Sequence, residues 1–141
     1  MAKEHRLNAT HALLDEPDLE IMQFNSAYKA WMTSLQKQMP ELHEDFDLIL
    51  DRLYVADEKD PAYPMHVFQW YTGPYIDMML NKDPNFFDEI ARDSEGKSMP
   101  ISFLDHFRRL DKQSQMRAWK TLEFIMRLTS AVYRETYRIT R

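Results

Sequence analysis

Apolar residues recur at helical spacing through most of this chain. The longest such pattern runs from Asp111 to Tyr137 and contains no Pro or Gly. One row comprises Trp119, Leu122, Met126, Thr129 and Tyr133, and an overlapping row comprises Ala118, Leu122, Ile125, Leu128 and Val132. Together the rows make an apolar face wider than a surface helix needs. We therefore predict that residues 111–137 form the helix on which the other elements pack.

A second strong helical pattern runs from Asp15 to about Gln38. Its first residues, Asp15-Glu16-Pro17, supply an N-cap candidate, an acid and a proline, which are typical of a first helical turn. The apolar residues of this segment are Ile21, Phe24, Tyr28, Trp31 and Leu35, spaced three, four, three and four. This seam is heptad-like but too short for a coiled coil, so it favours packing into a core.

Prolines divide the segment between residues 39 and 80. Pro40 opens a predicted helix that ends near Tyr54, and residues 55–64 are predicted to form a loop. A third helix is predicted from Pro64 to residue 80, with Gly73-Pro74 in its middle. An internal proline costs a helix about 3 kcal/mol. We therefore expect a kink or a short break at Gly73-Pro74.

Two shorter helices are predicted before the last one. Asp83-Pro84 has the residue types of an N-cap followed by a first helical position. A polar loop is predicted over residues 91–100. Ser98 is a candidate cap for a helix that begins at Pro100, and Asp111 or Ser114 is predicted to start the last helix.

The composition supports an all-α class. The 141 residues include two glycines, which are too few for the Gly-rich loops that bind phosphates. Runs of Val, Ile and Thr are also scarce, which argues against sheets. We predict a single compact bundle of five or six helices over residues 15–141, with a long C-terminal helix. Residues 1–14 have weak patterning, so we expect them to be a flexible segment.

The chain contains no cysteine, which excludes disulfides, thiolate zinc sites and cysteine nucleophiles. No apolar run approaches the ~18 residues that suggest a membrane span. The first residues lack the continuous apolar region of a secretory signal, so we do not expect secretion.

Charge is distributed unevenly along the chain. Residues 41–60 contain eight acids and two bases, whereas residues 106–141 contain nine bases and three acids. Such asymmetry occurs in nucleic-acid-binding proteins. We favour a simpler interpretation because the whole chain has a net charge of −5. In that interpretation the two segments face each other, within one chain or between copies.

A basic stripe on the last helix is the candidate nucleic-acid site. Its residues are Arg127, Arg134, Arg138 and Arg141, and Tyr133 and Tyr137 are interleaved with them. Arginines can bind phosphates, and aromatic rings can stack on bases. Alternatively, the stripe pairs with the acidic second helix or with another subunit, and it also complements the helix dipole. We favour these structural interpretations.

Aromatic residues of the third helix are the candidate partner interface. They are Phe68, Trp70, Tyr71 and Tyr75, accompanied by Met65, Met78 and Met79. They exceed what one core face accommodates, and adjacent Trp70 and Tyr71 cannot both point inward from one helix. Because Trp, Tyr and Met are enriched at interfaces, part of this surface is expected to bind a partner. The alternative is a helix that is buried on two sides.

No pattern of metal ligands or catalytic residues is apparent. His43 and Asp47 are spaced to share one helix face, but two ligands do not make a metal site. Acid pairs such as Asp88 and Glu89 lie on segments that look solvent-exposed, whereas catalytic carboxylates need a pocket that separates their pKa values. We therefore predict a protein that is not an enzyme and that needs no cofactor.

The motif order in residues 65–133 resembles that of small uncharacterised helical proteins of nucleocytoplasmic large DNA viruses. An aromatic-rich helix is followed by YIDMMLNKDPNFF, a loop, and ISFLDHFRRLDKQSQMRAWKTLEFIMRL. The residues that carry the resemblance are Ile76, Asp83, Phe86, Phe87, Trp119 and Leu122. The chain departs from the pattern at Pro84 and in its N-terminal pair of helices. The resemblance implies a viral source and a role in infection, and it carries over no chemical activity.

Together these observations favour a non-enzymatic structural or adaptor protein of a large DNA virus. We expect it to form a homodimer, to contact host or virion proteins, and to reside in the virion or the infected cell. The rival hypothesis is nucleic-acid binding through the basic last helix.

Overall fold

The computed structural model describes residues 16–133, although the side chains of residues 16–18 and 57 lie outside that description. Its elements are α2 (Glu16–Gln38), η2 (Pro40–Leu42), α3 (His43–Lys59), α4 (Tyr63–Thr72), η3 (Gly73–Tyr75), α5 (Ile76–Leu80), α6 (Asn85–Asp93), α7 (Phe103–Phe107) and α8 (Lys112–Val132). Counting α4, η3 and α5 as one interrupted helix, this part of the chain has six helices and no strand. The predicted all-α class with a long last helix is confirmed. The predicted flexible segment, residues 1–14, lies outside the described residues.

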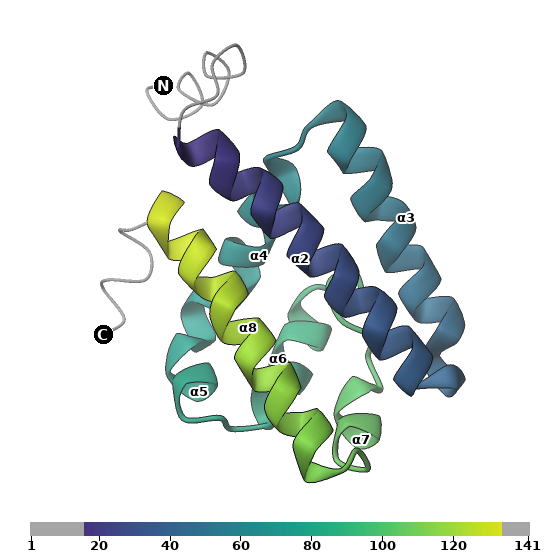
Figure 1. The fold of residues 1–141 in the computed structure, drawn as a ribbon. Coiled ribbons are helices and arrows are strands. Elements are labelled where there is room, and N and C mark those ends of the chain that lie inside the picture. The colour runs from purple at the N-terminus through teal and green to yellow at the C-terminus, as the bar shows by residue number, and fades with distance from the viewer. Residues whose placement is uncertain (1–15, 134–141) are drawn as a thin grey trace.

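Helix α2 lies between α3 and α8 and packs against both, as Figure 1 shows. All five residues of its heptad-like seam are at most 6% exposed. The prediction that the last helix organises the fold is therefore corrected. The central helix is α2, because it packs against α8, α3 and α4.

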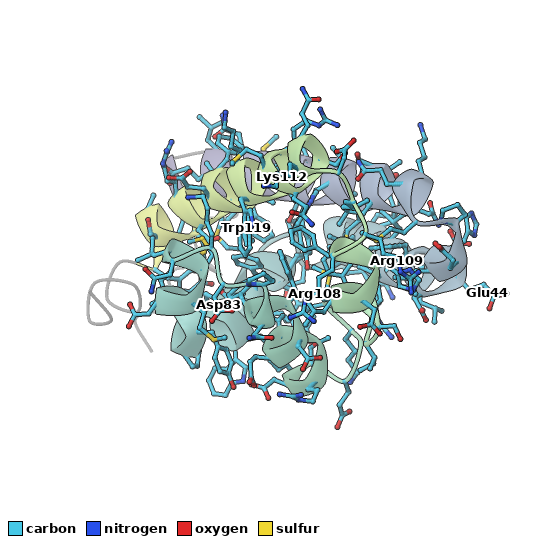
Figure 2. The ribbon with its side chains drawn as sticks, turned by 90° about the horizontal axis from the view of Figure 1, so that it is seen from below. Glu44, Asp83, Arg108, Arg109, Lys112 and Trp119 are labelled. Carbon is cyan, nitrogen blue, oxygen red and sulfur yellow. The ribbon has the colours of Figure 1, made fainter. Side chains whose placement is uncertain are left out.

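Helix α8 contributes its predicted apolar rows to the core. Trp119, Leu122 and Met126 are buried, and Figure 2 shows Trp119 pointing from α8 into the interior. There the indole ring meets Phe87 of α6 and Phe107 of α7, with ring centroids 4.9 and 5.8 Å away. The last helix thus closes over a cluster of aromatic rings from the short helices.

The boundaries of α3 and α8 differ from the predicted ones. Helix α3 continues to Lys59 instead of ending near Tyr54, because Leu53 and Ala56 keep its inner face buried through an otherwise polar run. The backbone N–H of Asp60 donates to the carbonyl of Ala56 at the end of the helix. Helix α8 ends at Val132, before the predicted Tyr137, because Tyr133 leaves the helical conformation with φ −112° and ψ 57°.

The predicted break at Gly73-Pro74 is confirmed as the 3₁₀ turn η3. A proline there removes one backbone donor and clashes with the preceding turn, so α4 cannot continue directly into α5. In the last turn of α4 the Thr72 hydroxyl donates to the carbonyl of Phe68, 2.6 Å away. The helix predicted from Pro64 to residue 80 is therefore divided into two helices, α4 and α5.

Of the predicted helix caps, the one at the start of α8 is confirmed. The Asp111 carboxylate accepts a 2.7 Å hydrogen bond from the Ser114 N–H and caps α8. Before α6 the Asp83 carboxylate accepts from the Asn85 N–H, but the N-cap position is occupied by Pro84 and not by the predicted Asp83. The expectation for Ser98 is corrected. Ser98 is buried, its N–H donates to the Ser94 hydroxyl, and α7 begins later, at Phe103.

Candidate functional site

The aromatic residues of α4 and η3 divide between the core and the surface. Phe68 is 5% exposed and its ring lies 5.5 Å from that of Phe24, so it belongs to the core and not to a partner surface. Trp70 is 67% exposed. Tyr71 and Tyr75 are half-buried, and the Tyr75 hydroxyl donates to Asp93 at 2.6 Å. This hydrogen bond raises the pKa of Tyr75.

The exposed side of α4 carries aromatic residues one helical repeat apart, with the exposed His66 between them. Tyr63 is 54% exposed, and Trp70 lies seven positions later on the same side. Val67 lies between them and is partly exposed. Residues 61–76 contain no Asp, Glu, Lys or Arg. Such a surface has the residue types that are enriched at protein interfaces.

A pocket of about 140 Å³ adjoins this surface, between α3, α4 and the turn 94–99. It is lined by Tyr28, Ile49, Arg52, Leu53, Ala56, Tyr63, Pro64, Val67, Phe68, Tyr71, Lys97 and Ser98. Tyr28 is buried at the inner side of the pocket, and its hydroxyl donates a 2.9 Å hydrogen bond to the Ser98 carbonyl. Burial raises the pKa of the Tyr28 phenol. Arg52 and Lys97 are exposed, so the pocket has an apolar interior and two cations at its rim.

The outer side of α8 forms a basic face, which we define as Met116, Arg117, Lys120, Phe124 and Arg127. Met116 and Phe124 are each 46% exposed. Arg127 lies 3.5 Å from Glu123 in an exposed ion pair. Arg117 and Lys120 form no ion pair with the described residues.

The other arginines of the predicted stripe, Arg134, Arg138 and Arg141, lie outside the described residues, as does Tyr137. The structure therefore places one member of that stripe, Arg127, on the basic face. It adds Phe124, an exposed aromatic residue that the sequence analysis did not select.

The outer side of α3 forms an acidic face, which we define as Glu44, Leu48, Asp51, Val55 and Glu58. These residues are spaced four, three, four and three, so they share one side of the helix. Leu48 is 57% and Val55 53% exposed. The three carboxylates form no ion pair with the described residues.

The acidic face and the basic face do not meet within the described fold. Helix α2 lies between α3 and α8 (Figure 1), and Figure 2 shows Glu44 at the outer edge of α3, far from Lys112 at the start of α8. Between the acidic and basic segments, the described residues make one such close contact, in which His106 Nδ1 lies 3.6 Å from a Glu41 carboxylate oxygen. Among residues 16–133, the acidic and basic faces therefore do not pair with each other within one copy.

Histidine and the paired acids have local roles in the described part of the chain. His43 lies 3.5 Å from Asp47 on the exposed side of α3. No group of three or more potential metal-ligating side chains forms among residues 16–133. Asp88 and Glu89 both contact Arg92, at 2.6 and 3.1 Å. The contacts with Arg92 stabilise α6. They neither assign a catalytic role to these acids nor exclude one.

Sequence reasoning missed the apolar members of the two faces. The available signal was periodicity, because Leu48 and Val55 fall outside the core row of α3 and are seven residues apart. The cations at the pocket rim were not predictable in this way. Arg52 and Lys97 are 45 positions apart, and the fold brings the Arg52 guanidinium to 3.4 Å from the Lys97 carbonyl.

Comparison with protein-family models, curated proteins and solved structures finds no match to this chain. The resemblance to proteins of large DNA viruses therefore stays a prediction. Within residues 16–133, none of the helices has both the length and the apolar character that crossing a bilayer requires.

Proposed function

We propose that this protein is a non-enzymatic assembly protein that binds further copies of itself. The observation that supports this most directly is the pair of faces on α3 and α8. They have opposite charge, each carries two exposed apolar side chains, and α2 keeps them apart within one chain. A second copy supplies the complement that each face lacks.

Charge alone is insufficient for such a contact. An exposed ion pair contributes about 0.2–1 kcal/mol, and salt screens it. Leu48 and Val55 on one face, and Met116 and Phe124 on the other, provide apolar area that adds to the pairing. The proposed interface therefore weakens as salt concentration rises, while its apolar part persists.

The positions of the faces favour a head-to-tail arrangement. When the α3 of one copy meets the α8 of another, each copy keeps one free α3 face or one free α8 face. Heterologous contacts of this kind form rings or open chains. The proposal thus refines the expected homodimer into an assembly in which a dimer is the smallest unit.

Sedimentation velocity over a range of protein and salt concentrations tests the proposal. We expect the sedimentation coefficient to rise with protein concentration and to fall when salt is added. Asp51→Lys and Lys120→Glu, each on one face, should both shift assembly to higher protein concentrations. The control Asp105→Lys alters an exposed acid of α7 and should assemble like the wild type. A wild type that stays monomeric at every concentration and at low salt would refute self-assembly.

Nucleic-acid binding through α8 is the second candidate, because the exposed cations Lys120 and Arg127 lie on the same face as Phe124. Fluorescence anisotropy with labelled single-stranded DNA and RNA tests it. Binding that falls steeply with salt and disappears in Lys120→Glu with Arg127→Glu supports this candidate. No binding at low salt removes it.

The proposed setting, in a virus particle or an infected cell with host or virion partners, rests on the resemblance alone. Quantitative mass spectrometry of purified particles tests it. A high copy number supports a virion component, and absence from particles favours a factor that acts in the infected cell.

A further inference from the structure

The pocket between α3, α4 and the turn 94–99 has properties that self-assembly through α3 and α8 does not use. We propose that it binds the phenyl ring of a phenylalanine in an acidic segment of a partner protein. This inference is independent of the self-assembly proposal, because neither charged face lines the pocket.

The size of the pocket fits one aromatic ring. Its volume is about 140 Å³, and an engineered protein cavity of about 150 Å³ binds benzene. Leu53 and Ala56 of α3 and Val67 and Tyr71 of α4 supply an apolar lining. Transferring a phenyl ring from water into such a site is favourable, and the aromatic rings that line the pocket offer edge-to-face contacts.

The rim of the pocket selects negative charge. Arg52 and Lys97 are exposed, and neither forms an ion pair with the described residues. The Arg52 guanidinium is positioned by its 3.4 Å contact with the Lys97 carbonyl. A carboxylate beside the bound ring can pair with either cation, and Arg can bind it through two parallel hydrogen bonds. A basic residue beside the ring would be repelled.

The surface around the pocket fits a protein segment better than a small molecule. Tyr63 lines the pocket, and Trp70 continues the same side of α4 beyond it. A lone aromatic carboxylate would fill the pocket and leave Trp70 in water. A peptide anchored by its phenyl ring can also cover Trp70, and exposed aromatic side chains of this kind often dominate binding energy.

Titration with a short acidic peptide tests the proposal. The probe is an acetylated and amidated peptide of sequence Asp-Glu-Phe-Glu-Asp. One matched control replaces its Phe with Ser, and another replaces its four acids with Lys. Calorimetry measures affinity, and heteronuclear NMR identifies which residues respond. We expect saturable binding with shifts at Ala56, Val67 and Lys97, and at least tenfold weaker binding of both controls.

Protein variants separate the pocket from the other basic surface. Arg52→Glu with Lys97→Glu should weaken peptide binding at least tenfold, whereas Lys59→Glu, an exposed lysine of α3 outside the pocket lining, should not. Ala56→Phe should fill the pocket and abolish binding. An acidic peptide could also bind the basic face of α8, so Lys120→Glu is the control variant for that surface. This substitution should leave the affinity for the peptide unchanged.

Three results would overturn the proposal. The first is the absence of saturable binding of the acidic peptide at concentrations up to about 1 mM. The second is a loss of binding in Lys120→Glu with no effect of Arg52→Glu and Lys97→Glu, which would assign the peptide to α8. The third is binding of 3-phenylpropionate, but not of the peptide, at the same NMR signals, which would identify a small-molecule site.

Discussion

Replacing Phe87 with Ala should be among the most damaging single changes in this fold. Phe87 has no exposed surface and lies at the centre of the aromatic cluster. Its ring centroid lies 4.7 Å from Phe107, 4.9 Å from Trp119, 5.0 Å from Phe103 and 5.6 Å from Phe86. The substitution removes contacts that join α6 to both α7 and α8.

The expected loss of stability can be estimated from these contacts. Truncating a buried Phe to Ala costs about 3–5 kcal/mol, and aromatic pairs add about 0.5–1.5 kcal/mol beyond area burial. We expect about 5 kcal/mol, near the top of the range, because four rings surround this one. With an unfolding entropy of about 0.3 kcal/mol/K for a chain of this size, the melting temperature should fall by about 15 °C.

Urea unfolding followed by circular dichroism measures the change, and Phe124→Ala is the matched control. Phe124 is 46% exposed on the basic face of α8, so its truncation should change stability by less than about 0.5 kcal/mol. The control variant should nevertheless self-associate more weakly than the wild type. A Phe87→Ala protein within about 1 kcal/mol of the wild type would refute the central position of this ring.

Three further predictions concern polar and backbone features of the fold. Asp111→Ala should lower the melting temperature, because it removes the cap on the Ser114 N–H. This hydrogen bond lowers the pKa of Asp111, so the difference from the wild type should be complete above the ordinary pKa of 3.8 and vanish as pH falls below it. Tyr28→Phe removes the donor to the Ser98 carbonyl and should cost about 1–3 kcal/mol in urea unfolding. Burial raises the pKa of Tyr28, so the wild type should lose stability as pH rises above 10, the ordinary value, and Tyr28→Phe should flatten that loss. Gly96→Ala should cost about 1–2 kcal/mol by thermal unfolding, because its φ of +81° disfavours a side chain even though a Cβ would make only ordinary van der Waals contact with Ile101, at 3.6 Å.

Periodicity and prolines predicted the fold class and most helix starts. The seam from Ile21 to Leu35 is buried throughout, and the break at Gly73-Pro74 forms where an internal proline forbids a continuous helix. Helix ends were less predictable. The polar run after Tyr54 looked like a loop, but Ala56 is small and buried, and it extends α3 by one turn.

The central position of α2 could not be read from its own pattern. A narrow seam and a wide apolar face both indicate burial, and only the packed structure shows which helix has neighbours on several sides. The candidate interaction surfaces were likewise only partly predictable from the sequence. The sequence showed that Trp70 and Tyr71 could not both be buried, and Trp70 is the exposed one. The pocket rim joins Arg52 to Lys97 through tertiary packing, for which sequence spacing gives no signal.

Mixing two charge-reversed variants tests the central claim of head-to-tail assembly most directly. One variant carries Glu44→Lys with Asp51→Lys on α3, and the other carries Lys120→Glu with Arg127→Glu on α8. Sedimentation velocity should find each variant monomeric alone, because like charges then oppose one another at the interface. In an equimolar mixture every face again finds an oppositely charged partner, so larger species should return. A mixture that stays monomeric under conditions where the wild type assembles would contradict the pairing of α3 with α8.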